Sequence, residues 1–263
     1  MSVETRKTFI HPTAIVDPEA ELGPGVTVGP YSLIEANVSV GEGTIIGARV
    51  TIEGHTTIGK GNQIFTGAVI GSVTQDKKYK GGITYLRIGD RNKIREYVTI
   101  NPGTDDGSET IIGDDNLLMA YAHVAHNCVL GNKTIIANAG TLAGHVVIED
   151  RAVIGGLSGV HQFVRVGYLS IVGGSSKAVQ DIPPYVMVDG HPAKAYGLNV
   201  VGLERAEVPN EERLLLKRAF KIIFRYRLSV KNAVQILKKD LPASGAIQRI
   251  IKFLENSDRG ICK

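Results

Sequence analysis

The chain has 263 residues, of which 43% are hydrophobic, two are cysteine and none is tryptophan. Two cysteines give no disulfide framework, no apolar stretch reaches the roughly 18 residues of a membrane span, and residues 1–12 lack the apolar run of a signal peptide. We therefore expect a cytoplasmic protein with no integral membrane segment, long enough for a sizeable core and an appended domain.

The net charge of +4 is distributed unevenly along the chain. Residues 198–263 contain 14 Lys and Arg against 7 Asp and Glu, so the carboxyl-terminal part is basic and the rest is acidic. This basic part either receives an acidic partner or is an ordinary solvated helical surface. Its basic residues are not interleaved with aromatic ones and no binding motif is present, which argues against a nucleic-acid partner.

An aliphatic residue recurs at every sixth position from Ile10 to Val172. Of the 28 positions in this register, only Asp76, Gly82 and Asp106 fail. A period of six fits neither a helix nor an alternating strand. It fits short strands joined by tight turns and stacked coil upon coil, so that the aliphatic side chains form one internal column.

Hexapeptide repeats are typical of parallel β-helices, and the pattern resembles that of the left-handed β-helix family. The resemblance implies three hexads per triangular coil and a crossover opposite to the usual hand. We therefore predict a mainly β fold, a left-handed parallel β-helix with a carboxyl-terminal α-helical domain. Cys128 occupies a small inward position of its hexad, and we expect it to pack in the core.

Two segments, residues 72–87 and 101–110, interrupt the repeat, and the six-residue register resumes after each of them. Loops inserted on one face of a solenoid often form its binding surface. We therefore expect the functional site to lie beside these two segments.

The repeat ends near Gly174, and consecutive prolines make residues 181–185 a predicted linker. Beyond it, the spacing of apolar residues predicts helices over 214–223, 230–241 and 246–254, the first one preceded by an acidic turn. The expected domains are a β-helix over residues 1–185 and a helical domain over residues 186–263.

Four of the seven histidines, His123, His126, His145 and His161, fall close together in the sequence. With three hexads per coil, His126, Gly144 and Gln162 stack in one column at roughly 4.8 Å per coil. The sequence therefore predicts a compact histidine patch on an outer face. A histidine is a suitable general base near neutral pH. We expect His126 to fill that role, with the Gly144 amide as a donor to a developing oxyanion.

Several longer segments resemble one family of enzymes, the UDP-N-acetylglucosamine O-acyltransferases. The most specific are Ala-His-Val-Ala-His at 122–126 and Val-His-Gln-Phe at 160–163, followed by the helical tail. The other matching segments are His11–Ala14, Gln75–Asp76, Ile88–Asn92, Arg95–Glu96, Asp115–Met119, Leu142–His145, Gln180–Tyr185 and Ser257–Gly260.

The resemblance implies an acyltransferase of the first step of lipid A biosynthesis. Such an enzyme moves a 3-hydroxyacyl group from acyl carrier protein to the glucosamine 3-hydroxyl of UDP-N-acetylglucosamine. The implied attack is direct, with a histidine general base and with no cofactor or metal. The resemblance further implies a homotrimer whose sites lie in the clefts between adjacent prisms.

The family's functional residues have counterparts in this sequence. His126 matches the general base, Gly144 matches the oxyanion donor, and Gly174 matches the position that sets acyl length, where glycine leaves the groove open for roughly 12 to 14 carbons. The residues that match the family's substrate-binding set are Gln75, Asp76, Lys78, His123, His145, His161, Gln162, Asn199 and Arg205.

The sequence departs from the family pattern at two positions. Ala206 replaces the second of two adjacent basic residues that hold phosphate, which weakens the expected phosphate clamp. Asn127 replaces the aspartate that commonly follows the catalytic histidine. An amide can orient an imidazole but adds no negative charge to stabilise the imidazolium.

Three other functions stay open on the sequence. The first is the later N-acyltransferase of the same pathway, which is also built of hexads but usually carries an additional amino-terminal domain. The second is a β-helical hydratase in which three histidines bind zinc between subunits. The third is a scaffold without catalytic activity.

Overall fold

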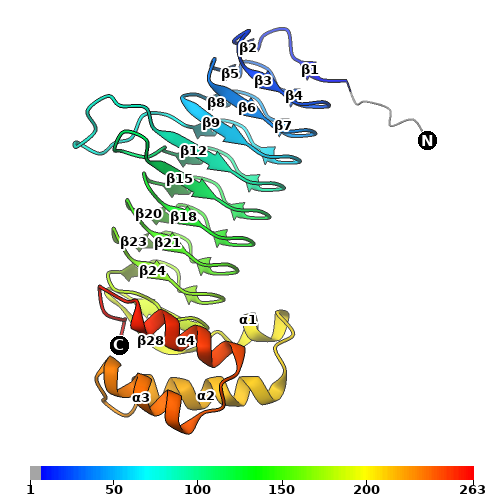
Figure 1. Cartoon of the computed structure of the whole chain (residues 1–263). Helices are drawn as coiled ribbons and strands as arrows, with labels where there is room; N and C mark the ends of the chain where they lie inside the picture. Colours follow the sequence, from blue (N-terminus) through cyan, green and yellow to red (C-terminus); the bar gives the residue numbers. More distant parts are fainter. Residues whose placement is uncertain (1–6) are drawn as a thin grey trace.

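The computed structural model describes residues 7–263, so residues 1–6 of the expected first domain lie outside the described residues. The chain winds into a three-sided β-helix that ends in a small group of helices, as Figure 1 shows. Within the described residues, no helix has the length and apolar character needed to cross a membrane.

Each side of the prism is one sheet to which every third strand belongs. Sheet A contains β1 (Phe9–Ile10), β4 (Thr27–Val28), β7 (Ile45–Ile46), β10 (Gln63–Ile64), β13 (Lys93–Ile94), β16 (Leu117–Leu118), β19 (Ile135–Ile136), β22 (Val153–Ile154), β25 (Ile171–Val172), β27 (Val186–Gly190) and β28 (Ala193–Leu198). Sheet B contains β2 (Ile15–Val16), β5 (Leu33–Ile34), β8 (Thr51–Ile52), β11 (Val69–Ile70), β14 (Thr99–Ile100), β17 (His123–Val124), β20 (Thr141–Leu142), β23 (Gly159–Val160) and β26 (Lys177–Ala178). Sheet C contains β3 (Glu21–Leu22), β6 (Val38–Val40), β9 (His55–Ile58), β12 (Tyr85–Ile88), β15 (Glu109–Ile112), β18 (Val129–Leu130), β21 (Val147–Ile148) and β24 (Arg165–Val166).

The strand register follows the six-residue period of the sequence. Most parallel partners are three hexads apart, as Ile15 and Leu33 are. Gln63 pairs with Lys93 across the first interruption, and Lys93 pairs with Leu117 across the second. These interruptions therefore add two hexads and one hexad, and the inward positions keep their phase.

The aliphatic column forms the core, as the sequence predicted. Ile34, Ile100 and Ile136 are fully buried, and Cys128 is buried with them. Successive coils also approach closely at the turns. A Cβ on Gly29 would collide with the backbone of Gly47 in the next coil, which explains why glycine follows the aliphatic residue so often.

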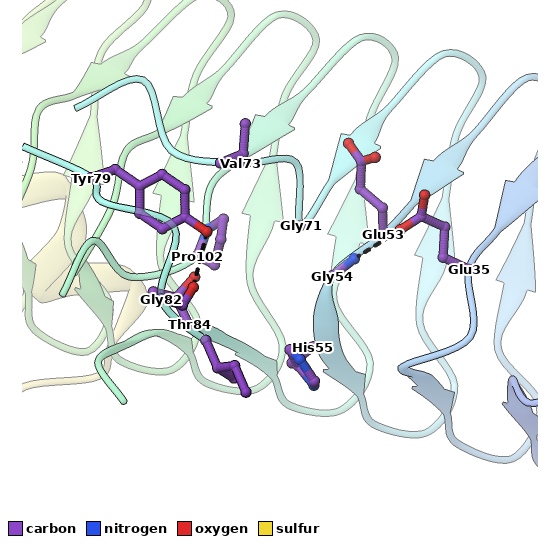
Figure 2. Close-up of a pocket in the computed structure, with 11 residues that line it drawn as sticks. Glu35, Glu53, Gly54, His55, Gly71, Val73, Tyr79, Gly82, Thr84 and Pro102 are labelled. Carbon is purple, nitrogen blue, oxygen red and sulfur yellow. Dashed lines mark hydrogen bonds between the residues drawn. The ribbon is translucent and has the colours of Figure 1, made fainter. Parts of the chain in front are cut away.

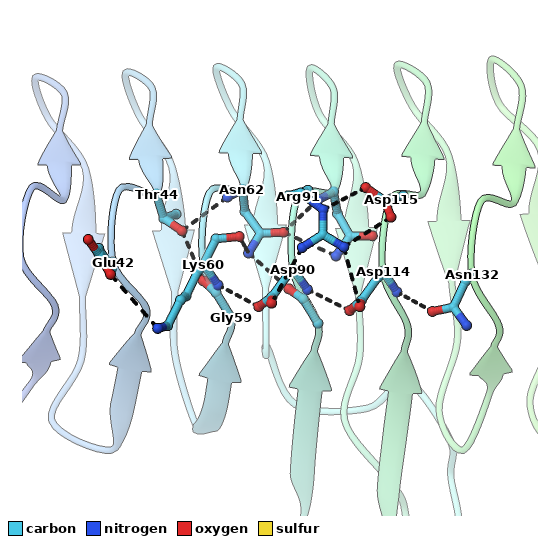
Figure 3. Close-up of polar contacts among 12 residues, drawn as sticks. Glu42, Thr44, Gly59, Lys60, Asn62, Asp90, Arg91, Asp114, Asp115 and Asn132 are labelled. Carbon is cyan, nitrogen blue, oxygen red and sulfur yellow. Dashed lines mark hydrogen bonds and ion pairs between the residues drawn. The ribbon is translucent and has the colours of Figure 1, made fainter.

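The edge between sheets C and A is held together by a ladder of polar side chains (Figure 3). The backbone N–H of Lys60 donates to Asp90 Oδ1 at 2.7 Å, that of Asp90 donates to Asp114 Oδ1 at 2.8 Å, and that of Asp114 donates to Asn132 Oδ1 at 2.7 Å. A second row of buried amides, at Asn62, Asn92 and Asn116, runs beside the first. Each coil is therefore fixed to the next at this edge.

Both insertions project from a different edge, the one between sheets B and C. The first loop spans residues 71–84 and the second loop spans residues 101–108. Ile83 N–H donates to Asp106 Oδ1 at 2.8 Å, and Gly107 N–H donates to the Ile83 carbonyl at 2.7 Å. The two loops are thus joined to each other where they leave the prism.

The helices are α1 (Val200–Arg205), α2 (Asn210–Phe224), α3 (Val230–Asp240) and α4 (Gly245–Glu255). The three predicted helices are confirmed by α2, α3 and α4, and α1 was not expected. Ser229 and Ser244 cap the last two helices by accepting from backbone N–H groups. The apolar faces of these helices pack together against the end of the prism.

The linker prediction for residues 181–185 was wrong. Ile182 is fully buried and bridges to Val166 of sheet C, while Asp181 Oδ1 accepts from the Arg165 N–H at 2.8 Å. The chain end also returns to this segment, since Asp181 N–H donates to the Gly260 carbonyl at 2.9 Å. The consecutive prolines end the regular repeat, but long-range pairing keeps the segment within the prism. Sheet A continues beyond residue 185 through β27 and β28.

Candidate active site

A cavity of about 520 Å³ lies on the edge between sheets B and C, beside the first loop. The column of His126, Gly144 and Gln162 forms one wall of it, and residues of the first loop form another. The cavity is lined by Gln75, Asp76, Lys77, Lys78, Asn101, His123, Ala125, His126, Ala143, Gly144, His145, Gln162 and Phe163. Segments that are far apart in the sequence therefore meet in one hollow.

His126 has a polar neighbour at each ring nitrogen. Its side chain is 14% exposed, and Nδ1 lies 2.9 Å from Asn127 Oδ1. Because an amide oxygen only accepts, a hydrogen bond between these two atoms requires the proton on Nδ1 and leaves a lone pair on Nε2. Nε2 lies 3.5 Å from Asp76 Oδ2, across the cavity wall. The ring is thus in the tautomer that can take up a proton at Nε2.

Gly144 lies directly against this ring, which is the adjacency expected from a coil of three hexads. A Cβ at position 144 would collide with Nε2 and Cε1 of His126. The Gly144 carbonyl accepts from Phe163 N–H at 3.1 Å, whereas no backbone hydrogen bond within residues 7–263 uses the Gly144 N–H. The site therefore holds a base and a free amide donor side by side.

Two further histidines stand beside His126. The His145 ring is perpendicular to the His126 ring at a centroid distance of 5.2 Å, and it stacks on Phe163 at 4.6 Å. His123 Nδ1 lies 2.7 Å from Thr99 Oγ1. Burial lowers the pKa of both His123 and His145, and the nearby His126 lowers each pKa further. The lowered pKa values favour the neutral rings, each of which has one donor and one acceptor nitrogen.

Not every predicted site residue lies in this cavity. His161 is exposed one coil further along, with Nδ1 3.4 Å from Arg259 Nη2, and Gly174 lies on the edge between sheets A and B. Asn199 caps α1 by accepting from Gly202 N–H at 3.0 Å, and Arg205 ends that helix. Of the predicted set, Gln75, Asp76, Lys78, His123, His126, Gly144, His145 and Gln162 share the hollow.

The cavity also contains residues that the sequence reasoning missed. Ala125 and Ala143 precede His126 and Gly144 in adjacent coils, and Phe163 lies one coil after His145. Extending the column by one residue on each side would have found these three, whereas Lys77 and Asn101, which were also missed, lie in the first and second loops. Among the described residues, no group of three or more His, Cys, Asp or Glu side chains is arranged to hold a metal ion.

Comparison with known proteins identifies the family. A sequence profile described as "Udp N-acetylglucosamine O-acyltransferase; Domain 2" matches residues 181–262, and one described as "Bacterial transferase hexapeptide (six repeats)" matches residues 109–144. The chain is 50% identical over 196 residues to the acyl-[acyl-carrier-protein]–UDP-N-acetylglucosamine O-acyltransferase of Synechocystis sp., covering 74% of this chain and 71% of that protein. It is 47% identical over 261 residues to the protein of the same name from Janthinobacterium sp., covering 97% of this chain and 100% of that protein.

Solved structures agree with the sequence relatives. LpxA from Acinetobacter baumannii superposes with a TM-score of 0.94 at 42% identity, covering 97% of this chain and 100% of that one. The Arabidopsis UDP-N-acetylglucosamine acyltransferase superposes with a TM-score of 0.86 at 36% identity, covering 97% and 100%. The predicted fold, a left-handed parallel β-helix of hexapeptide repeats followed by helices, is confirmed. The near-complete coverage at this identity shows that the chain belongs to the UDP-N-acetylglucosamine O-acyltransferase family.

Proposed function

We propose that the protein transfers a 3-hydroxyacyl group from acyl carrier protein to the 3-hydroxyl of the glucosamine in UDP-N-acetylglucosamine, the first step of lipid A biosynthesis. The observation that carries this proposal is the cavity in which His126 Nε2 lies directly against Gly144, whose N–H has no backbone acceptor among the described residues. Family membership supplies the substrates.

The reaction needs one base and one oxyanion donor. His126 Nε2 removes the proton from the sugar hydroxyl as its oxygen attacks the thioester carbonyl. The Gly144 N–H donates to the oxyanion that forms on that carbonyl. When the carbon–sulfur bond breaks, the proton on Nε2 passes to the departing thiolate, and the new ester stays on the sugar. This exchange needs no cofactor.

Asp76 provides the negative charge that Asn127 lacks. Its carboxylate lies 3.5 Å from His126 Nε2, and its side chain is 20% exposed. Once Nε2 has taken the proton, this pair becomes an ion pair in a partly dehydrated hollow, where the attraction exceeds that in bulk water. The first loop therefore supports the imidazolium from the side of the cavity rather than from the side of residue 127.

The nucleotide sugar and the acyl chain require a second copy of the chain. Arg205 and Gly174 lie outside the His126 cavity of their own chain, so we place them at a neighbour's site in a homotrimer. Asn199 is buried and its side chain is bonded to the Gly202 N–H and the Leu169 carbonyl, so its role is to hold α1 and with it Arg205. The outward aliphatic side chains Ile15, Leu33 and Ile45 are exposed in the single chain and suit burial between prisms. In this assembly Arg205 holds phosphate without a basic partner at Ala206. Light scattering that detects an active monomer would contradict the shared site.

Gly174 leaves room for a long acyl chain. A Cβ at this position would lie 3.5 Å from the Gly156 carbonyl oxygen, an ordinary contact, and would meet no other heavy atom within 4 Å. We propose a donor of roughly 12 to 14 carbons, with each matched methylene adding about 0.8 kcal/mol of burial. Assays with a series of hydroxyacyl donors should favour these lengths, and a clear preference for ten carbons would refute the proposal.

The basic face of α2 is the proposed dock for acyl carrier protein, which is the acidic partner. A groove of about 670 Å³ is lined by Lys217, Arg218 and Lys221 together with Glu211, Leu214 and Leu215, so three positive charges face one negative charge. Because these charges are exposed, added salt should raise KM for the carrier protein more than KM for the sugar. The use of a carrier-bound donor also supports a cytoplasmic location.

Replacing His126 with alanine tests the chemistry. General bases of this kind contribute roughly 10²- to 10⁴-fold, so kcat should fall by that factor while the circular dichroism spectrum is kept. His55→Ala, three coils away on sheet C, is the matched control and should keep full turnover. Full turnover by the His126 variant would place the base elsewhere.

Product and metal analysis separate the remaining functions. Mass spectrometry of the product formed from UDP-N-acetylglucosamine and mixed carrier-protein thioesters distinguishes an ester from the amide that an N-acyltransferase would make. Stoichiometric zinc in the active protein would favour a hydratase. A folded protein that forms no product with any donor would favour a scaffold.

A further inference from the structure

We propose that Thr104 is a positioning residue for His126, and that its backbone N–H determines which nitrogen of the His126 ring carries the proton. The inference rests on the proposed function, in which the unprotonated Nε2 is the base. It concerns Thr104 of the second loop, a residue to which neither the sequence nor the resemblance assigned a role.

The link runs through the side-chain oxygen of Asn127. This atom lies 3.1 Å from the Thr104 N–H donor and 2.9 Å from His126 Nδ1. Both groups meet the same oxygen, and the Thr104 amide can only donate. A flipped Asn127 amide would point its NH₂ group at the Thr104 N–H, donor against donor, so the oxygen is kept toward the ring.

The backbone of Asn127 is fixed as well. Its φ is +59°, a left-handed conformation that asparagine adopts more readily than most residues, and its N–H donates to Thr110 Oγ1 at 2.8 Å. With the backbone fixed, rotation of the terminal amide is the main freedom left to this side chain. The Thr104 N–H removes that freedom.

Thr104 is itself held by both loops. It is 4% exposed, and its Oγ1 lies 3.4 Å from Thr74 Oγ1 of the first loop, which accepts from the Asp76 N–H at 3.2 Å. The same loops share a second cavity lined by Tyr79 and Pro102 (Figure 2), where the Tyr79 hydroxyl donates to the Gly82 carbonyl at 2.9 Å. The loop pair therefore controls Nδ1 through Thr104 and faces Nε2 through Asp76.

This control is needed because residue 127 is an asparagine. A carboxylate presents an acceptor oxygen in either orientation, so an aspartate would keep the proton on Nδ1 without help. An amide keeps it there only while its oxygen faces the ring. The dependence on Thr104 should therefore disappear when Asn127 is replaced by aspartate.

The test is a double-variant experiment on the intact protein. Thr104→Pro removes the N–H donor, and Thr104→Ala keeps it while removing the hydroxyl. Each is made with Asn127 and with Asn127→Asp, and kcat, KM and oligomeric state are measured for all. Nitrogen-15 NMR of labelled histidine, assigned with a His126→Gln variant, reports the His126 tautomer independently of turnover.

With Asn127, we expect Thr104→Pro to lower kcat by about tenfold, the factor for loss of one buried hydrogen bond that sets an orientation. KM should change little, and the NMR spectrum should gain the Nε2–H tautomer. In the Asn127→Asp background, Thr104→Pro should lower kcat by less than about twofold. Thr104→Ala should keep the Nδ1–H tautomer.

Two results would overturn the proposal. One is an equal loss of kcat from Thr104→Pro in both backgrounds, which would indicate a general disturbance of the loop. The other is the Nε2–H tautomer in the unmodified protein, a measurement that needs no variant to fold. If His126→Ala kept full turnover while the tautomer followed Thr104 as expected, the proposed chemistry would fail and the positioning would stand.

Discussion

The contact between Gly144 and His126 yields a sharp prediction for Gly144→Ala. The backbone at position 144 has no positive φ, so alanine is allowed there by conformation. The new methyl group, however, would overlap Nε2 and Cε1 of the imidazole. The ring has to retreat by roughly 1 Å before the contact becomes an ordinary one.

A displacement of that size is large for catalysis. Misplacing a catalytic group by about 1 Å costs on the order of 10²-fold in rate. Asn127 Oδ1 lies 2.9 Å from His126 Nδ1, so a ring that retreats from position 144 strains this hydrogen bond. We expect kcat to fall by about 10²-fold, with KM for UDP-N-acetylglucosamine changing much less.

Steady-state assays with a carrier-protein thioester and UDP-N-acetylglucosamine measure this effect, and circular dichroism verifies the fold. Gly245→Ala is the control, because a Cβ at the start of α4 meets no atom within 4 Å. Turnover of the Gly144 variant within about threefold of the unmodified enzyme would refute the reasoning, since it would mean that the ring does not work from its observed position.

Three further predictions concern stability. Because the pKa of His123 and of His145 is lowered in the folded protein, the unfolded chain binds more protons below its ordinary histidine pKa of about 6.5. Tm should therefore fall as the pH drops below that value, and a His123→Gln/His145→Gln variant should show a shallower fall; an unchanged slope would contradict the assignment. Asn92→Ala leaves the buried Asn116 N–H without its acceptor and should lower the free energy of unfolding by about 1 to 3 kcal/mol in urea titrations. A change under 0.5 kcal/mol, roughly the value for a neutral surface site, would mean that the row of buried amides contributes little to stability. Ile136→Ala, in the fully buried column, should lower the free energy of unfolding by about 2 to 5 kcal/mol. Leu214 is exposed, so Leu214→Ala is the control, and an equal loss of stability in the two variants would argue against tight packing of the column.

The repeat predicted most of the fold because burial and chain path are coupled in a solenoid. Each hexad supplies one inward aliphatic residue, so the sequence spacing fixes which residues stack on one another. That arithmetic placed Gly144 beside His126 and Gln162 one coil further along, as the cavity shows. The apolar spacing of the helical end predicted α2, α3 and α4 for the same reason, and the short α1 carries too few residues to give a periodic signal.

The tail of the prism shows where local signals fail. Residues 181–185 have the composition of a linker, yet Ile182 is buried by pairing with Val166, and Asp181 receives the returning chain end at Gly260. The local sequence cannot predict either contact, because the partners Val166 and Gly260 lie outside the segment and Gly260 is near the far end of the chain.

The sequence by itself determined the stacked coils, the inward column and the grouping of histidines on one edge, since a period of six leaves the chain no other way to bury its aliphatic residues. Only the tertiary structure decided that Asp76 faces His126 Nε2 and that Thr104 faces Asn127, because inserted loops carry no repeat to fix their path. It also decided that Asn199, Arg205 and Gly174 stay outside the cavity of their own chain. Spacing sets position within the prism, but the contacts of a loop depend on which partners it meets in space.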